Sequence, residues 1–377
     1  MSEVTTLDEP VRRLQGEEAA QLQEGTAICL SGGGYRAMLF HAGSLWRLHV
    51  AGILADVDRI SSVSGGSITA GVLALAWPEL FKGGSFENLV VAPVRALARR
   101  TIDVGAVIGG AFGPGSIGDR VVDAYRKYLF QSRTLQDLPD KPRFVFNATN
   151  VQSGALWRFS KPYMCDYRVG RVNAPRIDLA VAVGASSAFP PFLSPAHLEL
   201  KEGEVVTVGG EDLHFVPYTT DVVLTDGGVY DNMGLETAWK LYRTILVSDA
   251  GGKLAAEPDP KGDWARHTVR VLDLIDNQVR SLRKRQVIGS FETGARKGTY
   301  WGIRTDIADY KLPGALPCPH DLTMELAAVK TRLARIEERW QERLINWGWA
   351  VTDAALRKHV NTTMPAGQFP YPRGVDR

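Results

Sequence analysis

The rest of the chain is organised around the stretch Thr26-Ala-Ile-Cys-Leu-Ser-Gly-Gly-Gly-Tyr-Arg-Ala-Met38. A short apolar run ends in three consecutive glycines, and a helical pattern begins directly after them. This order predicts a strand, a tight turn and a helix N-terminus. Glycine lets another atom approach the peptide N–H groups closely. Because a helix start also carries unpaired donors and partial positive charge, the turn suits a negative charge, either a bound phosphate or an oxyanion formed during a reaction.

Length and composition are those of an ordinary soluble globular protein. The 377 residues are enough for one large α/β domain or two smaller ones. A net charge of +2 argues against a nucleic-acid partner. The three cysteines, Cys29, Cys165 and Cys318, form no Cys-x-x-Cys pair. We therefore expect neither a disulfide framework nor a zinc site, and a reducing compartment fits.

Targeting and membrane signals are weak. The polar, acidic segment from Met1 to Gln23 lacks the basic-then-apolar order of a signal peptide. The closest approach to a long apolar run, Ala70 to Trp77, is too short to span a bilayer. We therefore expect a cytoplasmic protein whose contact with a membrane, if any, is peripheral.

A strand, a turn and a helix follow one another twice near the start of the chain. Apolar residues at helical spacing predict a helix from Tyr35 to Val50, with Gly52 at its C-terminal cap. A strand at Val57–Val63 then turns at Ser64 into a buried helix that Pro78 closes. This repetition favours a parallel sheet covered by helices.

Further elements are predicted downstream, and one glycine-rich segment is ambiguous. The patterns predict strands at Arg143–Thr149, Val222–Asp226 and Thr244–Val247, a helix at Ile177–Val183 and a hairpin at Val205–Val216. The segment Gly105–Gly118 is either a mobile, lipid-facing lid or an irregular connection packed on the core.

Beyond Pro260 the pattern becomes helical. Six apolar residues alternate by four and three and predict one long helix with an apolar stripe: Leu322, Leu326, Val329, Leu333, Ile336 and Trp340. The stripe either docks on the α/β core or forms a dimerising coiled coil. A basic cluster, Arg280, Arg283, Lys284 and Arg285, is either simply solvated or contacts anionic lipid.

Ser64 is the best candidate for a nucleophile. A serine at the apex of a strand–helix turn, between small residues, projects its hydroxyl into the open with helix N–H groups behind it. The turn reads Ser62-Val-Ser-Gly-Gly66, so Ser62 stands where the Gly-x-Ser-x-Gly pattern has its first glycine. Taken alone, a Ser-Gly-Gly turn is also a common structural feature.

A serine hydroxyl needs a base. His41, His197 and His214 have no context that marks a triad partner, and we expect them to be surface or core histidines. Asp226 is better placed, because it ends a predicted strand just before two glycines. Its carboxylate can accept the Ser64 proton directly, as a dyad. Open parallel sheets gather their sites at the carboxyl ends of the strands, so the three turns can converge.

Together these motifs resemble the patatin-like phospholipases. The segments that carry the resemblance are Ser31–Ala37, Ser62–Ser67 and Asp226–Gly228, with further similarity at Phe146–Asn150 and Ala185–Pro191. The first motif is closer to the cytosolic phospholipase A2 branch than to plant patatins. The resemblance covers about Thr26 to Gly252 and implies a three-layer α/β/α fold with a mainly parallel central sheet and a helical C-terminal extension.

The resemblance also implies a serine acyl hydrolase that acts on phospholipids or a membrane surface without a cofactor. Ser64 would attack the ester carbonyl while Asp226 takes its proton. The N–H groups of Gly33 and Gly34, with Gly32 as a further candidate, would hold the oxyanion. Arg36 matches the family arginine, which would stabilise the glycine loop or contact the phosphate headgroup; a surface ion pair is the alternative.

The expected organisation has three parts. A polar segment, residues 1–25, precedes a catalytic domain at residues 26–259, in which residues 82–140 form a variable, lid-like insertion. Residues 260–377 form a helical extension packed on that domain or continuous with it. No EF-hand spacing is present, so we expect no metal and no calcium requirement. A homo-oligomer and a small-molecule activator stay open.

Other functions compete with hydrolysis. Gly32-x-Gly34-x-x-Ala37 after a strand fits a dinucleotide-binding pattern, with Asp56 or Asp58 near the expected acidic position. That pattern leaves Ser64 and Asp226 unexplained. A non-catalytic protein that keeps the fold is a second alternative. A third is a regulated, membrane-degrading effector with the same chemistry, as in antiphage defence.

Overall fold

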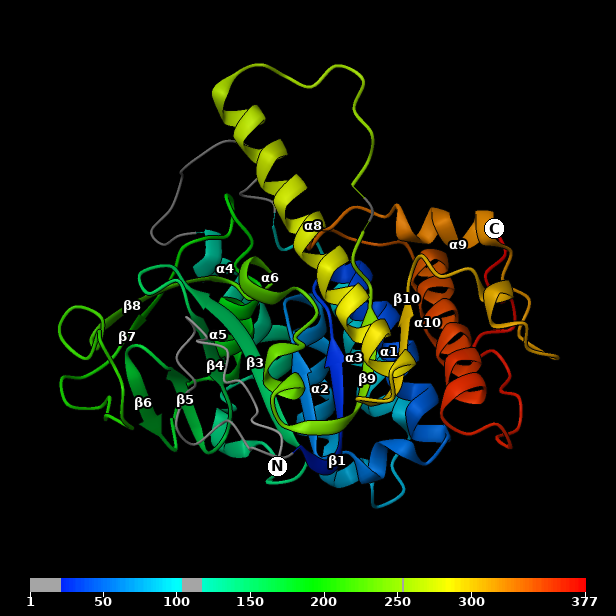
Figure 1. The fold of residues 1–377 in the computed structure, drawn as a ribbon, viewed down its shortest axis with the longest axis horizontal. Helices are drawn as coiled ribbons and strands as arrows, with labels where there is room; N and C mark the ends of the chain where they lie inside the picture. Colours follow the sequence, from blue (N-terminus) through cyan, green and yellow to red (C-terminus); the bar gives the residue numbers. More distant parts are fainter. Residues whose placement is uncertain (1–21, 104–116, 253) are drawn as a thin grey trace, which may run out of the picture.

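A computed structural model describes residues 22–103, 117–252 and 254–377 (Figure 1). The predicted loop Gly105–Gly118 lies almost entirely outside these residues, as does most of the N-terminal segment.

Within the described residues, ten strands form one sheet. The strands are β1 (Gln23–Leu30), β2 (Arg59–Ser62), β3 (Arg143–Asn150), β4 (Leu156–Phe159), β5 (Tyr163–Asp166), β6 (Gly170–Asn173), β7 (Ala196–Glu199), β8 (Asp221–Asp226), β9 (Tyr242–Asp249) and β10 (Lys297–Gly302). Their order is β10-β9-β1-β2-β3-β4-β5-β6, with β8 joined to β3 and β7 to β8. From β10 to β3 every pair is parallel, and the strands beyond β3 pair antiparallel.

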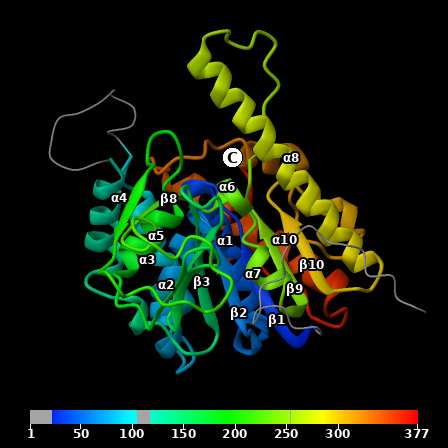
Figure 2. The same ribbon diagram turned by 60° about the vertical axis from the view of Figure 1, so that its left-hand side comes forward.

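Helices cover both faces of the sheet (Figures 1 and 2). They are α1 (Gly34–Val50), α2 (Gly65–Leu80), α3 (Ala92–Ala98), α4 (Ile117–Tyr125), α5 (Leu179–Ser186), α6 (Gly228–Asp231), α7 (Glu236–Trp239), α8 (Trp264–Glu292), α9 (His320–Ala327) and α10 (Glu338–His359). Short 3₁₀ or π turns lie at Ile53–Asp56, Glu87–Val91, Arg126–Phe130, Leu135–Asp137 and Ile307–Tyr310.

The side chains of β1 show why the fold has three layers. Successive residues of a strand point to opposite faces of its sheet. Ile28 and Leu30 join a large buried cluster with α1, α2 and α10. Ala27 and Cys29 join a smaller cluster with α7, β9 and α8. A strand buried on both faces reads as one continuous apolar run, as this one does. The predicted three-layer α/β/α fold is confirmed.

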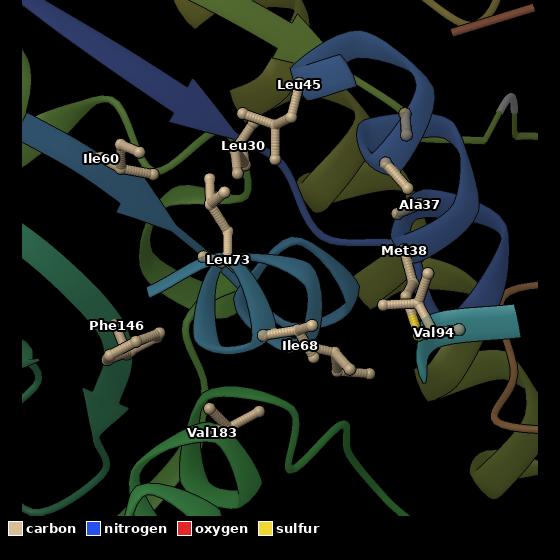
Figure 3. Close-up of a cluster of buried hydrophobic side chains, with 14 of the residues drawn as sticks. Leu30, Ala37, Met38, Leu45, Ile60, Ile68, Leu73, Val94, Phe146 and Val183 are labelled. Carbon is tan, nitrogen blue, oxygen red and sulfur yellow. The ribbon is translucent and has the colours of Figure 1, made fainter. Parts of the chain in front are cut away.

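The larger cluster packs α2 against the centre of the sheet. Leu30, Ile60 and Phe146 come from three neighbouring strands and are fully buried with Ile68 and Leu73 of α2 (Figure 3). Nearly every residue of α2 is buried, which accounts for its apolar character all round. Burial of this helix fixes the direction in which its first turn faces.

Two local predictions were wrong. Pro78 does not close α2, because it lies in the last turn and the helix continues to Leu80. The segment Val205–Val216 is no hairpin: Val206 forms an isolated bridge with Arg171, and the Glu211 carboxylate accepts hydrogen bonds from nearby N–H groups. A carboxylate that satisfies the backbone locally replaces the ladder that a hairpin needs.

The long helix predicted across Leu322–Trp340 is also wrong. Two helices, α9 and α10, are separated by residues 328–337, which we call the strap. Residues far away in the sequence form hydrogen bonds with the backbone groups of the strap. The carbonyl of Leu333 accepts the Ile102 N–H at 2.9 Å, and the Ile336 N–H donates to the Ala98 carbonyl at 2.8 Å. These tertiary hydrogen bonds outweigh the helical periodicity. Strand β10 was not predicted at all.

Helix α8 extends from the body, and its N-terminal end lies away from the rest of the ribbon (Figures 1 and 2). The basic cluster lies on its inner half. Arg280 is 3.5 Å from Asp249, and Arg283 is 3.0 Å from Glu236. These two cations are therefore paired within the fold, whereas Arg285 of the same cluster is exposed. Within the described residues, no helix combines the length and apolar character needed to cross a bilayer.

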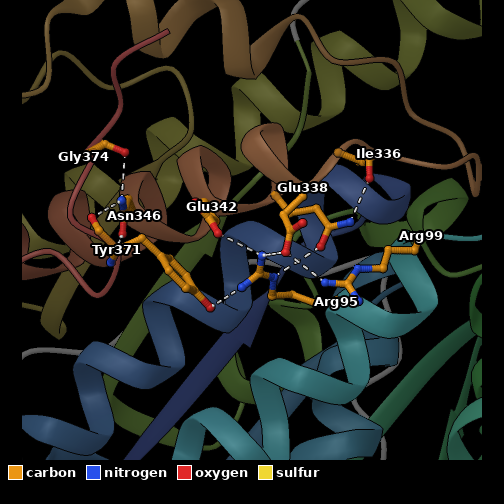
Figure 4. A network of polar contacts seen from close by, with 9 residues as sticks. Arg95, Arg99, Ile336, Glu338, Glu342, Asn346, Tyr371 and Gly374 are labelled. Carbon is orange, nitrogen blue, oxygen red and sulfur yellow. Dashed lines mark hydrogen bonds and ion pairs between the residues drawn. The ribbon is translucent and has the colours of Figure 1, made fainter.

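Helix α10 packs on α1 and is largely buried. A Cβ placed on Gly43 would lie 1.9 Å from the Ile345 carbonyl oxygen, and one on Gly348 would lie 1.9 Å from that of Phe40. The two backbones therefore touch where both helices carry glycine. The buried pair Arg47–Asp353 (2.8 Å) adds a charged contact. At the start of α10 a polar network joins it to α3 (Figure 4).

Gly348→Ala should destabilise the protein by about 3 kcal/mol or more, because overpacking at a backbone contact forces the two helices apart. The matched control is Gly289→Ala in α8, where an added Cβ meets nothing within 4 Å. That variant should be neutral or gain up to about 1 kcal/mol from helix propensity. Urea unfolding of both variants measures the difference, and equal effects would contradict the close crossing.

Candidate active site

Strands β2 and β8 end against each other along one edge of β3. The last residue of β2, Ser62, lies opposite Phe146, and the last residue of β8, Asp226, lies opposite Ala148. Both use the edge of β3 that β4 does not occupy. Only the position of Asn147 separates the two strand ends. We had expected neighbouring parallel strands, but β8 is antiparallel to β3, so the turns converge end to end.

Ser64 occupies a strained turn between β2 and α2. Its φ of 51° is unusual for a residue with a side chain. A Cβ on Gly65 would lie 2.1 Å from the Gly34 carbonyl oxygen, and one on Gly66 would lie 2.7 Å from that of Leu30. The two glycines therefore let the turn press against β1 and the glycine loop. Ser64 itself is buried, with an exposed fraction of 7%, so its hydroxyl does not project into the open as the sequence predicts.

The carboxyl of Asp226 is buried, with an exposed fraction of 2%. Its Oδ1 accepts the Gly228 N–H at 2.7 Å. Its Oδ2 has no hydrogen-bond partner among the described residues. Burial raises the pKa of Asp226 to about 7, although the bond from Gly228 and the nearby Ser64 hydroxyl pull it down. The Ser64 hydroxyl thus lies near enough to the Asp226 carboxyl to lower its pKa.

The glycine loop, residues 31–34, lies against the serine turn. A Cβ on Gly32 would lie 3.1 Å from the Ser64 Cβ. Gly33 and Gly34 have φ angles of 143° and 60°, which glycine adopts without strain. The Gly32 N–H donates to the Asn232 carbonyl at 2.9 Å and is therefore already occupied. Neither the Gly33 nor the Gly34 N–H donates to another described residue, so both are candidate anion donors.

Arg36 lies behind this loop and not at the surface. Its side chain is buried, its Nε donates to the Ala250 carbonyl at 3.1 Å, and its Nη1 donates to the Val329 carbonyl. Burial and the neighbouring Arg280 lower its pKa to about 10. A Cβ on Gly33 would lie 3.0 Å from Nη2. The buried Arg36 guanidinium thus supports the glycine loop from behind. Arg36 does not form a surface ion pair.

The histidines are structural. His41 is fully buried between the Ser248 hydroxyl and the Ser31 carbonyl, each 2.9 Å from a ring nitrogen. Burial lowers its pKa to about 4, so the ring is neutral. His197 is exposed and pairs with Asp221 at 3.1 Å. His214 contacts the Val169 carbonyl at 2.9 Å.

Three residues that position the site had no assigned role in the sequence. The Asn147 amide donates to the Ser61 hydroxyl and the Ser62 carbonyl, each at 2.9 Å. The Ser186 hydroxyl accepts the Ser64 N–H at 3.1 Å. The Asn232 side chain fills the space that the missing Cβ atoms of Gly32 and Gly228 leave. Asn147 and Ser186 fall in the two weaker similarity segments, whereas no pattern pointed to Asn232.

The dinucleotide alternative does not fit this geometry. Asp58 precedes β2, at the amino end of the sheet and away from the glycine loop. Its carboxylate already accepts the Thr26 N–H and pairs with Lys141, both at 2.9 Å. Asp56 lies one turn earlier on the same end. Neither carboxylate can reach a ribose held at the loop.

Comparison with known proteins agrees with the fold and the order of the turns. The patatin-like phospholipase family model matches residues 28–239, more than half of the chain. The chain therefore belongs to the patatin-like phospholipase family. No curated protein matches it in sequence.

Solved structures of human GIVD cytosolic phospholipase A2 share the fold. One has a TM-score of 0.51 and 12% identity, covering 92% of this chain and 60% of that chain. Another, in complex with Methyl gamma-Linolenyl Fluorophosphonate, has a TM-score of 0.52 and 14% identity, covering 91% and 58%. The chain thus spans about three-fifths of the length of these proteins.

The raised pKa of Asp226 predicts a pH-dependent stability. The native carboxyl holds its proton up to about pH 7, whereas the unfolded chain releases it near the ordinary value of 3.8. Native stability is therefore lost as the pH rises between these values. Asp226→Asn removes this titration. The free energy of unfolding of the variant minus that of the parent should therefore be about 2 to 3 kcal/mol higher at about pH 8 than at about pH 5.

Chemical unfolding at both pH values measures this difference. Asp56→Asn, at an exposed aspartate, is the matched control for the replacement of a carboxyl by an amide. An Asp226→Asn effect that does not change with pH would show that the native carboxyl is already ionised in this range.

Proposed function

We propose that this protein is a serine acyl hydrolase that cleaves fatty-acyl esters of glycerophospholipids through the dyad Ser64–Asp226. One observation carries the proposal. A strained serine turn lies beside a buried carboxyl, and next to it lie the N–H groups of Gly33 and Gly34. Within the part of the chain that the structure describes, one oxygen of this carboxyl and both N–H groups have no hydrogen-bond partner. Nucleophile, base and anion donors are the three parts that ester cleavage requires.

In this mechanism the Ser64 Oγ attacks the ester carbonyl and passes its proton to the Asp226 carboxylate. The tetrahedral intermediate collapses to acyl-Ser64, and the leaving alcohol takes the proton from Asp226. A water then attacks the acyl group and gives its proton to Asp226, which returns it to Ser64 as the fatty acid leaves. Because the pKa of Asp226 is about 7, its carboxylate is a stronger base than an ordinary aspartate near neutral pH.

The developing oxyanion is assigned to the N–H groups of Gly33 and Gly34. Both lie at the start of α1, where the helix dipole adds partial positive charge. Donors fixed before the reaction stabilise charge without having to reorganise. Arg36 keeps the loop in place from behind, which is the first of the two roles expected for it. Gly32 shapes the loop and leaves room for Asn232.

A cavity of about 210 Å³ is the proposed site for an acyl chain. It begins at Ser187 and Ala188, and the Ala188 carbonyl accepts the Asp226 N–H at 3.0 Å. Its apolar walls come from α4, α5, β7, β8 and the segment between α5 and β7, and include Val121, Val122, Val181, Leu193, Leu198 and Leu224. Ser64 and Asp226 do not line it, so the chain would leave the reacting carbonyl towards this cavity.

Exposed apolar side chains beside the site support a substrate held in a lipid surface. Phe189, which follows Ala188, is 46% exposed, and Val229, three residues after Asp226, is 56% exposed. Apolar side chains at the rim of a polar site mark a contact with another apolar phase. We therefore propose that the protein acts at the membrane surface as a peripheral protein.

Ser64→Ala and Asp226→Asn should each lower fatty-acid release from phospholipid vesicles by about 10⁴-fold or more, because nucleophile and base act as one unit. Ser85→Ala, at an exposed serine, is the matched control and should keep the parental rate. Mass spectrometry of the released acids and lysolipids measures the rate and the position of cleavage. Parental activity in Ser64→Ala would rule out the mechanism.

Phe189→Glu and Val229→Glu should lower hydrolysis of vesicles about tenfold while leaving a soluble short-chain ester unaffected, because a charge disfavours contact with lipid but not chemistry. Val50→Glu is the control. Val50 is 59% exposed but ends α1 at the opposite end from the glycine loop. Parallel assays on both substrates test this, and equal losses on the two would argue against a membrane-facing rim.

A further inference from the structure

We infer that the strap positions the oxyanion donors, and that the ion pair between Asp103 and Arg332 holds the strap in place. The inference rests on the proposed function of the Ser64 site. The strap lies after the part of the chain that the family model matches, residues 28–239, whereas Asp103 lies within that part. Asp103 and Arg332 are positioning residues, since neither side chain belongs to the reacting groups.

The main chain of Arg332 rests directly on the glycine loop. Its carbonyl accepts the Tyr35 N–H at 3.0 Å. A Cβ placed on Gly34 would lie 2.6 Å from that carbonyl oxygen and 2.8 Å from the Arg332 nitrogen. Gly34 is therefore packed between the strap and the Ser64 turn. The strap accepts the hydrogen bond from the Tyr35 N–H and therefore fixes the orientation of the first turn of α1.

The strap is also tied to the loop from behind. The Val329 carbonyl accepts a hydrogen bond from Arg36 Nη1. Arg36 in turn donates to the Ala250 carbonyl at the end of β9. The strap thus contacts the first turn of α1 at one point through its backbone and at another through a buried guanidinium. Movement of the strap would release both contacts together.

Asp103 is the anchor of the strap. Its carboxylate accepts two bonds from Arg332, from Nε at 3.0 Å and from Nη2 at 3.1 Å. It also accepts the Leu333 N–H at 3.1 Å, and the neighbouring Ile102 N–H donates to the Leu333 carbonyl. The Asp103 side chain is 8% exposed and that of Arg332 is 38% exposed. A fork geometry of this kind fixes direction as well as distance.

The test uses the full chain and breaks the anchor without touching the glycine loop. Asp103→Asn removes the charge, and Arg332→Gln removes the fork. Arg332→Lys keeps the charge but not the two parallel bonds. The matched control is Arg99→Gln, because Arg99 pairs at 2.9 Å with Glu338, the first residue of α10 directly after the strap (Figure 4). That pair is 56% and 62% exposed and does not contact the loop.

The first readout is hydrolysis of phospholipid vesicles with kcat and KM separated. Asp103→Asn and Arg332→Gln should lower kcat about 10- to 100-fold with KM unchanged, because a small misplacement of the donors acts on the transition state. Arg332→Lys should lie between Arg332→Gln and the parent. Arg99→Gln should keep the parental kcat.

The second readout is hydrogen exchange, which does not depend on activity. Peptides that contain Tyr35 should exchange faster in the two anchor variants, whereas peptides from the centre of β1 should keep the parental rate, which shows that the fold is intact. Unchanged exchange at Tyr35 would overturn the inference. Faster exchange with unchanged kcat would overturn it too, while Ser64-dependent hydrolysis, and with it the proposed function, would stand.

A third outcome separates the two proposals. If hydrolysis by the parent does not depend on Ser64, the proposed function fails and the role of the strap in catalysis fails with it. A loss of kcat in Arg99→Gln equal to that in Arg332→Gln would assign the effect to general loosening of the chain and would also overturn the inference.

Discussion

The structure depends on the close approach of three backbones at Gly34. On one side the serine turn presses against the Gly34 carbonyl, where a Cβ on Gly65 would lie 2.1 Å away. On the other side the main chain of Arg332 lies where a Gly34 Cβ would be. Only residues without side chains permit this contact, since protein interiors leave no spare volume. The consecutive glycines therefore serve packing as much as conformational freedom. The Gly33 and Gly34 N–H groups, which have no partner among the described residues, are a consequence of that packing.

Burial of the Asp226 carboxyl decreases the stability of the fold and increases the reactivity of the carboxylate. An isolated carboxylate away from water is unfavourable, and among the described residues only Oδ1 of Asp226 accepts a hydrogen bond. The pKa of Asp226 is raised because burial disfavours its charged form. The same environment makes the carboxylate a better proton acceptor when the group is ionised. The rigid ends of β2 and β8 on the edge of β3 keep this arrangement in place, because β3 is held by strands on both edges.

Local signals in the sequence were sufficient for the parts of the fold that depend on neighbouring residues. The glycine loop, the serine turn and the strand before Asp226 all follow from short patterns of glycine, apolar and polar residues. The sequence did not predict the direction of β8, the strap or strand β10, because partners far away in the chain decide each of them. Periodicity across Leu322–Trp340 suggested one helix, but hydrogen bonds to Ile102 and Ala98 interrupt it. Asn232 was missed for the same reason, since its contacts with Gly32 and Gly228 arise only in the folded chain.

The C-terminal region acts on the site through α1. This helix begins at the glycine loop, so whatever fixes its axis also fixes the N–H groups at its start. Helix α10 holds α1 at its middle through the contact of Gly43 with Ile345, and farther along through the pair Arg47–Asp353. The strap holds the first turn through Tyr35. A rigid helix fastened at three levels cannot rotate its first turn without disturbing a buried contact. We therefore infer that residues after β9 help to fix the first turn of α1 and the glycine loop, although none of them takes part in the proposed chemistry.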